Sequence, residues 1–305
     1  MNRPEPSSPL TPGIWAALGA FFLWGVLPLY WKALQETPAP TIIAHRTVWS
    51  LLILWCILAW QGKARTTLQS LRQPRIAIWH LLSGSLLAGN WLLYVWATLH
   101  GRIIEAAFGY YLNPFFNMLF GYWLFAERQT RLQKISIAIA LAGVACQFRG
   151  VHGFPWIAVT LALSFSLYAV VKKKSPLGSL PGLSLETLLL APIALLWLTT
   201  TTPSFAQTMS TFNNQTLLLI GTGFATATPL LLFGYATRKI SLTTLGMLQF
   251  LGPTLQFFIG WKVYHETMTL ERSLSFVLIW LAIALYGYSL RIKSRESAEK
   301  GTITS

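Results

Sequence analysis

Charged residues are scarce in this sequence. Only 10% of its 305 residues are charged, and nine of them are acidic, whereas a typical soluble domain carries about 25% charged residues. A chain with 54% hydrophobic residues has too few polar groups to cover its surface in water. We therefore predict an all-α integral membrane protein with the lipid bilayer as its main partner.

Cysteines are scarce and catalytic motifs are missing. Cys56 and Cys146 fall in separate apolar runs, which argues against a disulfide framework or a cysteine-based metal site. No histidine or carboxylate cluster has metal-ligand spacing, and no Walker phosphate-binding loop is present. We therefore expect no enzyme, no metal, no cofactor and no direct use of ATP.

The shortage of acidic residues leaves a net charge of +14. A nucleic-acid-binding chain would gather its basic residues on a soluble face. Here lysine and arginine lie in short gaps between apolar runs, which is typical of the positive-inside rule. We therefore expect no nucleic-acid partner.

Apolar runs are long enough to cross a bilayer ten times. A span needs about 20 mostly apolar residues, and each should be helical because lipid-exposed backbone must satisfy its own hydrogen bonds. Residues 1–12 form a polar tail, and no cleavage site follows the first run, so we predict that this run is retained. The predicted spans are residues 13–31, 41–60, 76–99, 103–125, 133–149, 154–171, 184–202, 214–237, 242–264 and 272–290.

An even number of spans puts both termini on one side. Most of the 23 lysines and arginines then fall on that side, including those of a second tail, residues 292–305. The positive-inside rule predicts that both termini are cytoplasmic. We expect a multi-pass protein of a bacterial inner membrane, with a monomer and a homodimer as the alternatives.

One segment of the chain occurs twice. "GYYLNPFFNMLFGYWLFAE", residues 109–127, aligns without a gap on "LQFLGPTLQFFIGWKVYHE", residues 248–266, so that Pro114 matches Pro253. We predict two five-helix repeats, residues 13–149 and 153–291. Because each has an odd number of spans, the second is inverted in the membrane, a recurring construction of secondary transporters that places the substrate near the midplane.

The repeated segment carries polar residues at helical spacing. The first stripe is Tyr110, Asn113 and Asn117, and the second contains Gln249 and Gln256. Polar groups are costly in hydrocarbon and normally face a partner or a wet cavity, so we expect the stripes to face each other across a central cavity. The prolines Pro114 and Pro253 should interrupt or bend their helices there. The alternative is that the amides only join neighbouring helices.

Aromatic residues with polar tips are further candidates for the cavity wall. Asn90 and Tyr94 share a helix face, with Trp91 beside them. Most such side chains lie at lipid interfaces or in packing, but together they favour a flat or aromatic, partly apolar substrate. The remaining candidates are Trp24, Tyr168 and Tyr235.

Ionisable residues inside the spans are the candidates for coupling. Arg46 is costly in a span and should be paired or wet, either with Glu105 or with a substrate carboxylate. His45 could carry a proton because histidine titrates near neutral pH. Glu186 lies at a matching depth in the second repeat, either as a coupling site or as a partner of residues 172–174.

Glu127 and its repeat mate Glu266 have a simpler interpretation. Each ends a predicted helix and precedes a short turn. We expect each carboxylate to cap the next helix, whose N-terminus attracts negative charge.

Six segments resemble one known family. They are "FFLWGVLPLYWK", "HRTVWS", "GNWLLYVWA", "EAAFGYYLNP", "LETLLLAP" and "LQFLGPT". In this order, over residues 13–291, the chain resembles the RarD proteins, of the EamA branch of the drug/metabolite transporter superfamily. The resemblance implies ten helices in two inverted repeats, with the fifth and tenth outside the cavity, and export or exchange of small metabolites or drugs.

The leading hypothesis is a secondary transporter that exports small organic molecules by alternating access, with protons as a candidate coupling ion. An integral-membrane enzyme acting on lipid-linked substrates is the alternative. It would need several loop-borne carboxylates or histidines, and nine acidic residues are spread too thinly. An ion channel would need rings of charge around a pore.

Overall fold

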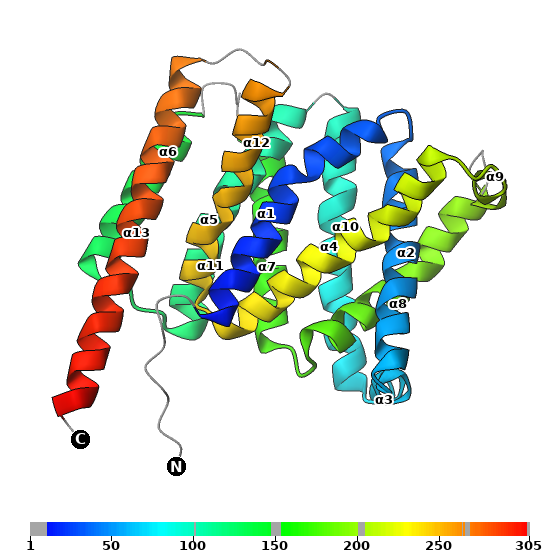
Figure 1. The fold of residues 1–305 in the computed structure, drawn as a ribbon, viewed down its shortest axis with the longest axis horizontal. Coiled ribbons are helices and arrows are strands. Elements are labelled where there is room, and N and C mark those ends of the chain that lie inside the picture. Colours follow the sequence, from blue (N-terminus) through cyan, green and yellow to red (C-terminus); the bar gives the residue numbers. More distant parts are fainter. Residues whose placement is uncertain are drawn as a thin grey trace.

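A computed structural model describes residues 11–100, 102–147, 154–200, 205–263, 265 and 269–303, and the regular structure of these residues is entirely helical (Figure 1). The helices are α1 (Pro12–Ala33), α2 (Ala39–Trp60), α3 (Ala64–Ser70), α4 (Pro74–Leu99), α5 (Ile103–Phe125), α6 (Arg131–Ala145), α7 (Trp156–Lys174), α8 (Ser179–Thr200), α9 (Phe205–Ser210), α10 (Asn214–Lys239), α11 (Leu242–Gln249), α12 (Leu251–Lys262) and α13 (Leu270–Ile303).

Eight segments of the described chain are long and apolar enough to cross a membrane: α1, α2, α4, α7, α8, α10, α11 with α12, and α13. The prediction of an all-helical, multi-pass membrane protein is therefore confirmed. Each of the ten predicted spans overlaps a helix, but α5 and α6 are not among the eight. Helix α6 is too short to be counted, since it has only 15 residues. Helix α5 is long enough, but Glu105, Asn113 and Asn117 lower its mean hydropathy.

The helices pack in a regular set of pairs. Helix α5 lies against α7 and α11, while α1 lies against α10, α11 and α12. Helices α2 and α8 form a further pair, and α10 and α4 each contact both of them. Helices α6 and α13 pack on each other at the left edge of Figure 1.

One end of the bundle carries the start of α1, the end of α13 and α3, at the bottom of Figure 1. Lys172, Lys173 and Lys174 occupy the last turn of α7, and Arg238 and Lys239 the last turn of α10. The Lys173 ammonium donates to the carbonyls of Thr237 (3.0 Å) and Ile240 (2.5 Å). We call this side the basic end.

Glu127 caps a helix, but not the one predicted. Its carboxylate accepts hydrogen bonds from the backbone N–H of Leu242 at 2.7 Å and of Thr243 at 2.9 Å, so it caps α11 instead of α6. Helix α6 has its own capping box, formed by Thr130 and Gln133. The expectation that Glu127 caps the next helix is wrong because tertiary contact brings α11 closer, and Glu266 lies outside the described residues.

The two repeated prolines behave differently. Helix α5 runs without a break through Pro114, whereas in the second copy α11 ends at Gln249 and α12 begins at Leu251, just before Pro253. The predicted interruption at Pro114 is therefore absent. A Cβ at Gly246 of α11 would lie 2.7 Å from the Pro114 carbonyl oxygen, so glycine permits this close approach of α11 to an unbroken α5.

Candidate functional site

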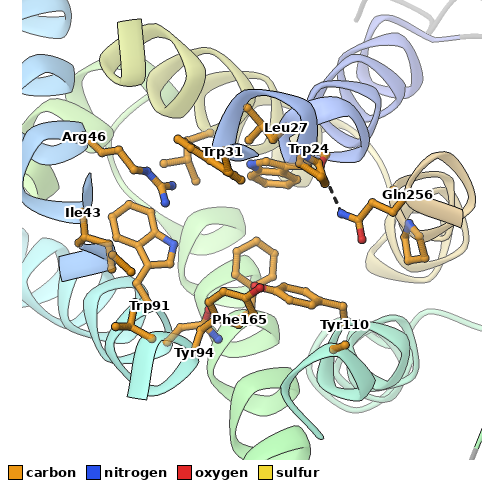
Figure 2. A pocket seen from close by; sticks show the side chains of 18 of the residues that line it. Trp24, Leu27, Trp31, Ile43, Arg46, Trp91, Tyr94, Tyr110, Phe165 and Gln256 are labelled. Atoms are coloured by element: carbon orange, nitrogen blue, oxygen red, sulfur yellow. Dashed lines mark hydrogen bonds between the residues drawn. The ribbon is translucent and has the colours of Figure 1, made fainter. Parts of the chain in front are cut away.

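A cavity of about 430 Å³ lies among the helices (Figure 2). Its lining is mostly aromatic and aliphatic, with a few amides and hydroxyls and one charged side chain. The lining residues are Phe21, Trp24, Leu27, Pro28, Trp31, Ala39, Ile42, Ile43, Arg46, Asn90, Trp91, Tyr94, Val95, Ala107, Tyr110, Phe165, Leu230, Gln249, Gly252, Pro253 and Gln256. Small-molecule sites typically have this composition, in which a few polar groups orient an otherwise apolar ligand.

Arg46 is the charged residue of this lining. Its guanidinium lies over the rings of Trp91, 4.5 Å from the centroid, and Trp31, 5.1 Å away, and its Nε donates to Thr226 Oγ1 at 2.8 Å. Figure 2 shows the guanidinium projecting between the two indoles. Cation–π contacts stabilise the charge but do not neutralise it, so the cavity carries a net positive charge.

The predicted pair between Arg46 and Glu105 is not formed. Glu105 forms an ion pair with Arg102 at 2.6 Å, and its carboxylate accepts a hydrogen bond from the backbone N–H of Ile157 at 2.9 Å. Glu105 thus caps the start of α7. The carboxylate is therefore held by the start of α7 and by Arg102.

Aromatic rings in tilted and edge-to-face contact close the cavity toward the basic end. We call Phe21, Trp24, Phe165 and Phe233 the aromatic floor. Phe165 and Phe233 lie 5.2 Å apart by ring centroids, and Trp24 lies 5.5 Å from Phe233. Such contacts are worth about 0.5–1.5 kcal/mol each beyond burial. The floor continues into a buried apolar cluster of α1, α7, α10 and α11.

Of the residues predicted to line a cavity, seven do so, together with Arg46 and Pro253. The seven are Trp24, Asn90, Trp91, Tyr94, Tyr110, Gln249 and Gln256. Tyr94 and Tyr110 lie edge to face, 5.8 Å apart. Gln256 donates to the Trp24 carbonyl at 3.4 Å, so the second amide stripe reaches the cavity from α12.

The amides of the first stripe form hydrogen bonds that join helices. Asn113 donates to the Ala162 carbonyl at 2.9 Å. Asn117 donates to the side-chain oxygens of Asn113 at 3.2 Å and Gln249 at 2.9 Å. The two stripes therefore meet directly at Asn117 and Gln249, and Gln249 also lines the cavity. For Asn113 and Asn117 the hydrogen bonds match the alternative of a joint between helices.

The other predicted residues lie outside this cavity lining. His45 is buried and accepts from the Trp49 indole N–H at 3.3 Å. Tyr235 is exposed, with Lys239 over its ring at 5.9 Å. Tyr168 and Glu186 are both fully buried, and the Tyr168 hydroxyl donates to the Glu186 carboxylate at 3.1 Å.

Glu186 is paired as its alternative interpretation predicted. The Lys172 ammonium donates to Glu186 Oε1 at 2.9 Å, and Ser83 Oγ donates to the same oxygen at 2.6 Å. His80 Nδ1 lies 3.4 Å from it. The pairing with one of residues 172–174 is therefore confirmed.

Two features of this region were missed by sequence reasoning. Trp31 lies seven residues after Trp24, on the same face of α1, and could have been found by that spacing. His80 and Ser83 precede Asn90 and Tyr94 along one face of α4 at intervals of three, seven and four residues, which extends the predicted polar stripe toward the basic end.

Comparison with known proteins places these residues in a family. Residues 11–149 match the EamA-like transporter family. Protein RarD of Escherichia coli is 34% identical over 281 residues, covering 90% of this chain and 93% of its own. An uncharacterized transporter of Pseudomonas aeruginosa is 37% identical, covering 92% and 94%. The chloramphenicol-sensitive protein RarD of the same organism is 27% identical, covering 95% and 98%.

The fold also has a counterpart among solved structures. One crystal structure superposes with a TM-score of 0.71 at 18% sequence identity, covering 92% of this chain and 98% of the other. At this identity the likeness concerns the fold alone.

Proposed function

Because the chain belongs to the EamA-like transporter family and is similar to its RarD proteins over most of its length, we propose that it is a secondary transporter of small organic anions with a flat apolar part. The observation that carries the proposal is the cavity: aromatic walls around one guanidinium that no acidic lining residue neutralises.

The physical argument starts from the charge. An ion held in low-dielectric surroundings needs an opposite charge or water, and a guanidinium binds a carboxylate through two parallel hydrogen bonds. A substrate carboxylate supplies the missing charge, while indole and phenol rings supply flat contact area. The amides of Gln249 and Gln256 are placed to orient the polar atoms of such a ligand.

The architecture proposed is ten spans in two inverted repeats, residues 13–149 and 153–291. If the two halves are exchanged, α1 corresponds to α7, α2 to α8 and α4 to α10. Helix α5 corresponds to α11 with α12, and α6 to α13. The packing of α5 and α4 on α7 then maps onto that of α11–α12 and α10 on α1, while the α2–α8 and α6–α13 pairs map onto themselves. This supports alternating access by exchange of conformations between the halves.

The orientation proposed puts the basic end, and both termini, in the cytoplasm of a bacterial inner membrane. The cavity residues of α1 and α2 lie near the opposite ends of these helices, Trp24 to Trp31 and Ala39 to Arg46, and the aromatic floor lies toward the basic end. This supports an outward-facing conformation. Export fits an anion, since a membrane potential negative inside drives negative charge out by about 2.3 kcal/mol per 100 mV.

A topology test addresses this architecture. A reporter fused after Arg291 should read cytoplasmic, and one fused within α9 should read periplasmic. Matched fusions at Gln61, expected inside, and at Thr37, expected outside, are the controls. An inverted result at either test site rejects the ten-span arrangement.

A binding test addresses the substrate class. Naphthoate should quench the tryptophan fluorescence of the purified protein, because Trp24, Trp31 and Trp91 line the cavity, and its neutral methyl ester should quench far less. Arg46→Ala should remove this difference, and Thr187→Val, outside the cavity lining, should keep it. Equal binding of acid and ester by the unaltered protein contradicts an anion site.

A further inference from the structure

A second group of ionisable residues lies below the aromatic floor, toward the basic end. We call His80, Ser83, Tyr168, Lys172 and Glu186 the Glu186 cluster; each is at most 2% exposed. Lys172 and Ser83 donate to one carboxylate oxygen of Glu186 and Tyr168 to the other. None of the five residues lines the cavity.

The cluster joins the two halves of the molecule. His80 and Ser83 come from α4 in the first half, whereas Tyr168 and Lys172 come from α7 and Glu186 from α8 in the second. A Cβ at Gly182 of α8 would stand 2.9 Å from His80 Cε1. The contact between the halves is therefore tight at this level, and its polar bonds converge on one carboxylate.

Tyr168 links the cluster to the cavity. Its ring is stacked on Phe233, with centroids 6.1 Å apart and an interplanar angle of 6°, and lies 5.8 Å from Phe165. Both phenylalanines belong to the aromatic floor, and the Tyr168 hydroxyl donates to Glu186 Oε2 at 3.1 Å. A change at the carboxylate therefore reaches the floor through a single side chain.

The cluster is balanced in charge, and one added proton unbalances it. The Glu186 carboxylate and the Lys172 ammonium, 2.9 Å apart, neutralise each other. A protonated Glu186 would no longer offset the lysine charge, and a lone buried ammonium is costly. Lys172 lies in the last turn of α7, so its long side chain reaches water as soon as the basic end opens.

His80 provides a second proton-binding atom beside the carboxylate. Its Nδ1 lies 3.4 Å from Glu186 Oε1, and its Nε2 is buried without a hydrogen-bond partner among the described residues. The elements packed against α8 are α2, α3, α4 and α10, and α7 reaches α8 through the Lys172 and Tyr168 side chains. The titratable groups in contact with Glu186 are His80 from α4 and Lys172 and Tyr168 from α7. Helix α2 contacts this part of α8 through the Trp55 indole N–H, which donates to the Ser184 carbonyl at 3.2 Å.

We propose that the Glu186 cluster is the proton-binding site that controls opening at the basic end. With Glu186 ionised, the carboxylate holds α4 to α7 and α8 and keeps the floor closed. A proton added to Glu186 gives a neutral carboxylic acid, Lys172 turns to water, and the halves separate at this end. Loss of the proton to that water restores the carboxylate, which draws Lys172 back and closes the end. The inference rests on the proposed transporter function, but not on the substrate class.

Thiol labelling tests the proposal without a substrate. In a background of Cys56→Ser and Cys146→Ser, Ala169→Cys places a thiol at a fully buried position beside Tyr168. Inside-out membrane vesicles are treated with a membrane-impermeant methanethiosulfonate bearing a trimethylammonium group. Rates are divided by those of Gln61→Cys, an exposed position at the end of α2, which corrects for thiol ionisation.

The corrected rate should rise roughly tenfold between about pH 6 and about pH 4 as the open population grows, because the ammonium and the hydroxyl donors favour the ionised carboxylate until the medium is acidic. With Glu186→Gln, which mimics the protonated acid, labelling should be fast at both pH values. Tyr168→Phe should open at a higher pH than the unaltered protein, because the charged carboxylate has lost one donor. Thr187→Val, the next residue on α8, should respond like the unaltered protein.

Two results overturn the proposal: labelling that does not change with pH in the unaltered protein, or a Glu186→Gln variant that stays protected and still responds to pH. A variant that merely fails to fold would label equally in right-side-out vesicles, and the milder Tyr168→Phe then decides, since an unshifted response there also rejects the proposal. Failure of naphthoate to bind would reject the anion site and leave this result unaffected.

Discussion

Arg46 and Glu186 are both ionisable side chains inside the helical bundle, yet their surroundings differ in kind. Arg46 faces a cavity between two indoles, with one hydroxyl as its hydrogen-bond partner. Glu186 is packed in the core with a cation, two hydroxyl donors and a histidine on its carboxylate. An unmatched charge at a cavity indicates a ligand that completes it, whereas a matched charge in the core indicates a joint whose state can change.

The largest effect on stability is expected from removing Lys172, the cation that pairs with Glu186. Lys172→Met should destabilise the protein by about 3–5 kcal/mol, because it leaves a buried carboxylate without its cation. Lys172→Met combined with Glu186→Leu should recover much of that loss. Thermal unfolding in detergent measures both. A single variant as stable as the unaltered protein would mean that the pair is already open to water.

Arg46 should show the opposite behaviour, with an effect on ligand binding and little on stability. Arg46→Ala should weaken naphthoate binding by about 1.5–3 kcal/mol, the range for hydrogen bonds to charged groups. Arg46→Lys should recover part of it, because an ammonium does not reproduce a bidentate fork. Fluorescence titration measures the naphthoate affinity of each variant, and melting temperatures equal to that of the unaltered protein show that the variants are folded. Full recovery of affinity by lysine would show that charge alone matters.

The two amide stripes give the smallest and most diagnostic effects. Asn117→Ala should lower the free energy of unfolding by about 0.5–1.5 kcal/mol, because Asn117 bonds Asn113 and Gln249 between helices. Gln256→Ala should lower naphthoate affinity by a similar amount and leave stability nearly unchanged, because Gln256 lines the cavity. Melting temperature and affinity are compared for both variants. The opposite assignment would place the ligand on the Asn113–Asn117 side.

Local pattern predicted much of the cavity wall and little of the pairing. Spacing on a helix face singled out Asn90 and Tyr94, and the repeat singled out Gln249 and Gln256. Of the two alternatives for Arg46, the pair with Glu105 was wrong, because Glu105 pairs with Arg102 in the turn just before α5. Glu127 was assigned to α6 because sequence shows the next helix, not the helix that packs nearby.

Composition and periodicity by themselves determined a multi-pass helical membrane protein, since apolar runs of span length cannot be dissolved in water and must satisfy their own backbone hydrogen bonds. The repeated segment and the family segments pointed to a transporter. Only the tertiary structure decided that Arg46 faces a cavity whose lining holds no carboxylate to pair with it. It likewise decided that Lys172, His80 and Tyr168 converge on Glu186. The reason is geometric: charge pairing falls off with distance in space, and helices distant in the chain set that distance.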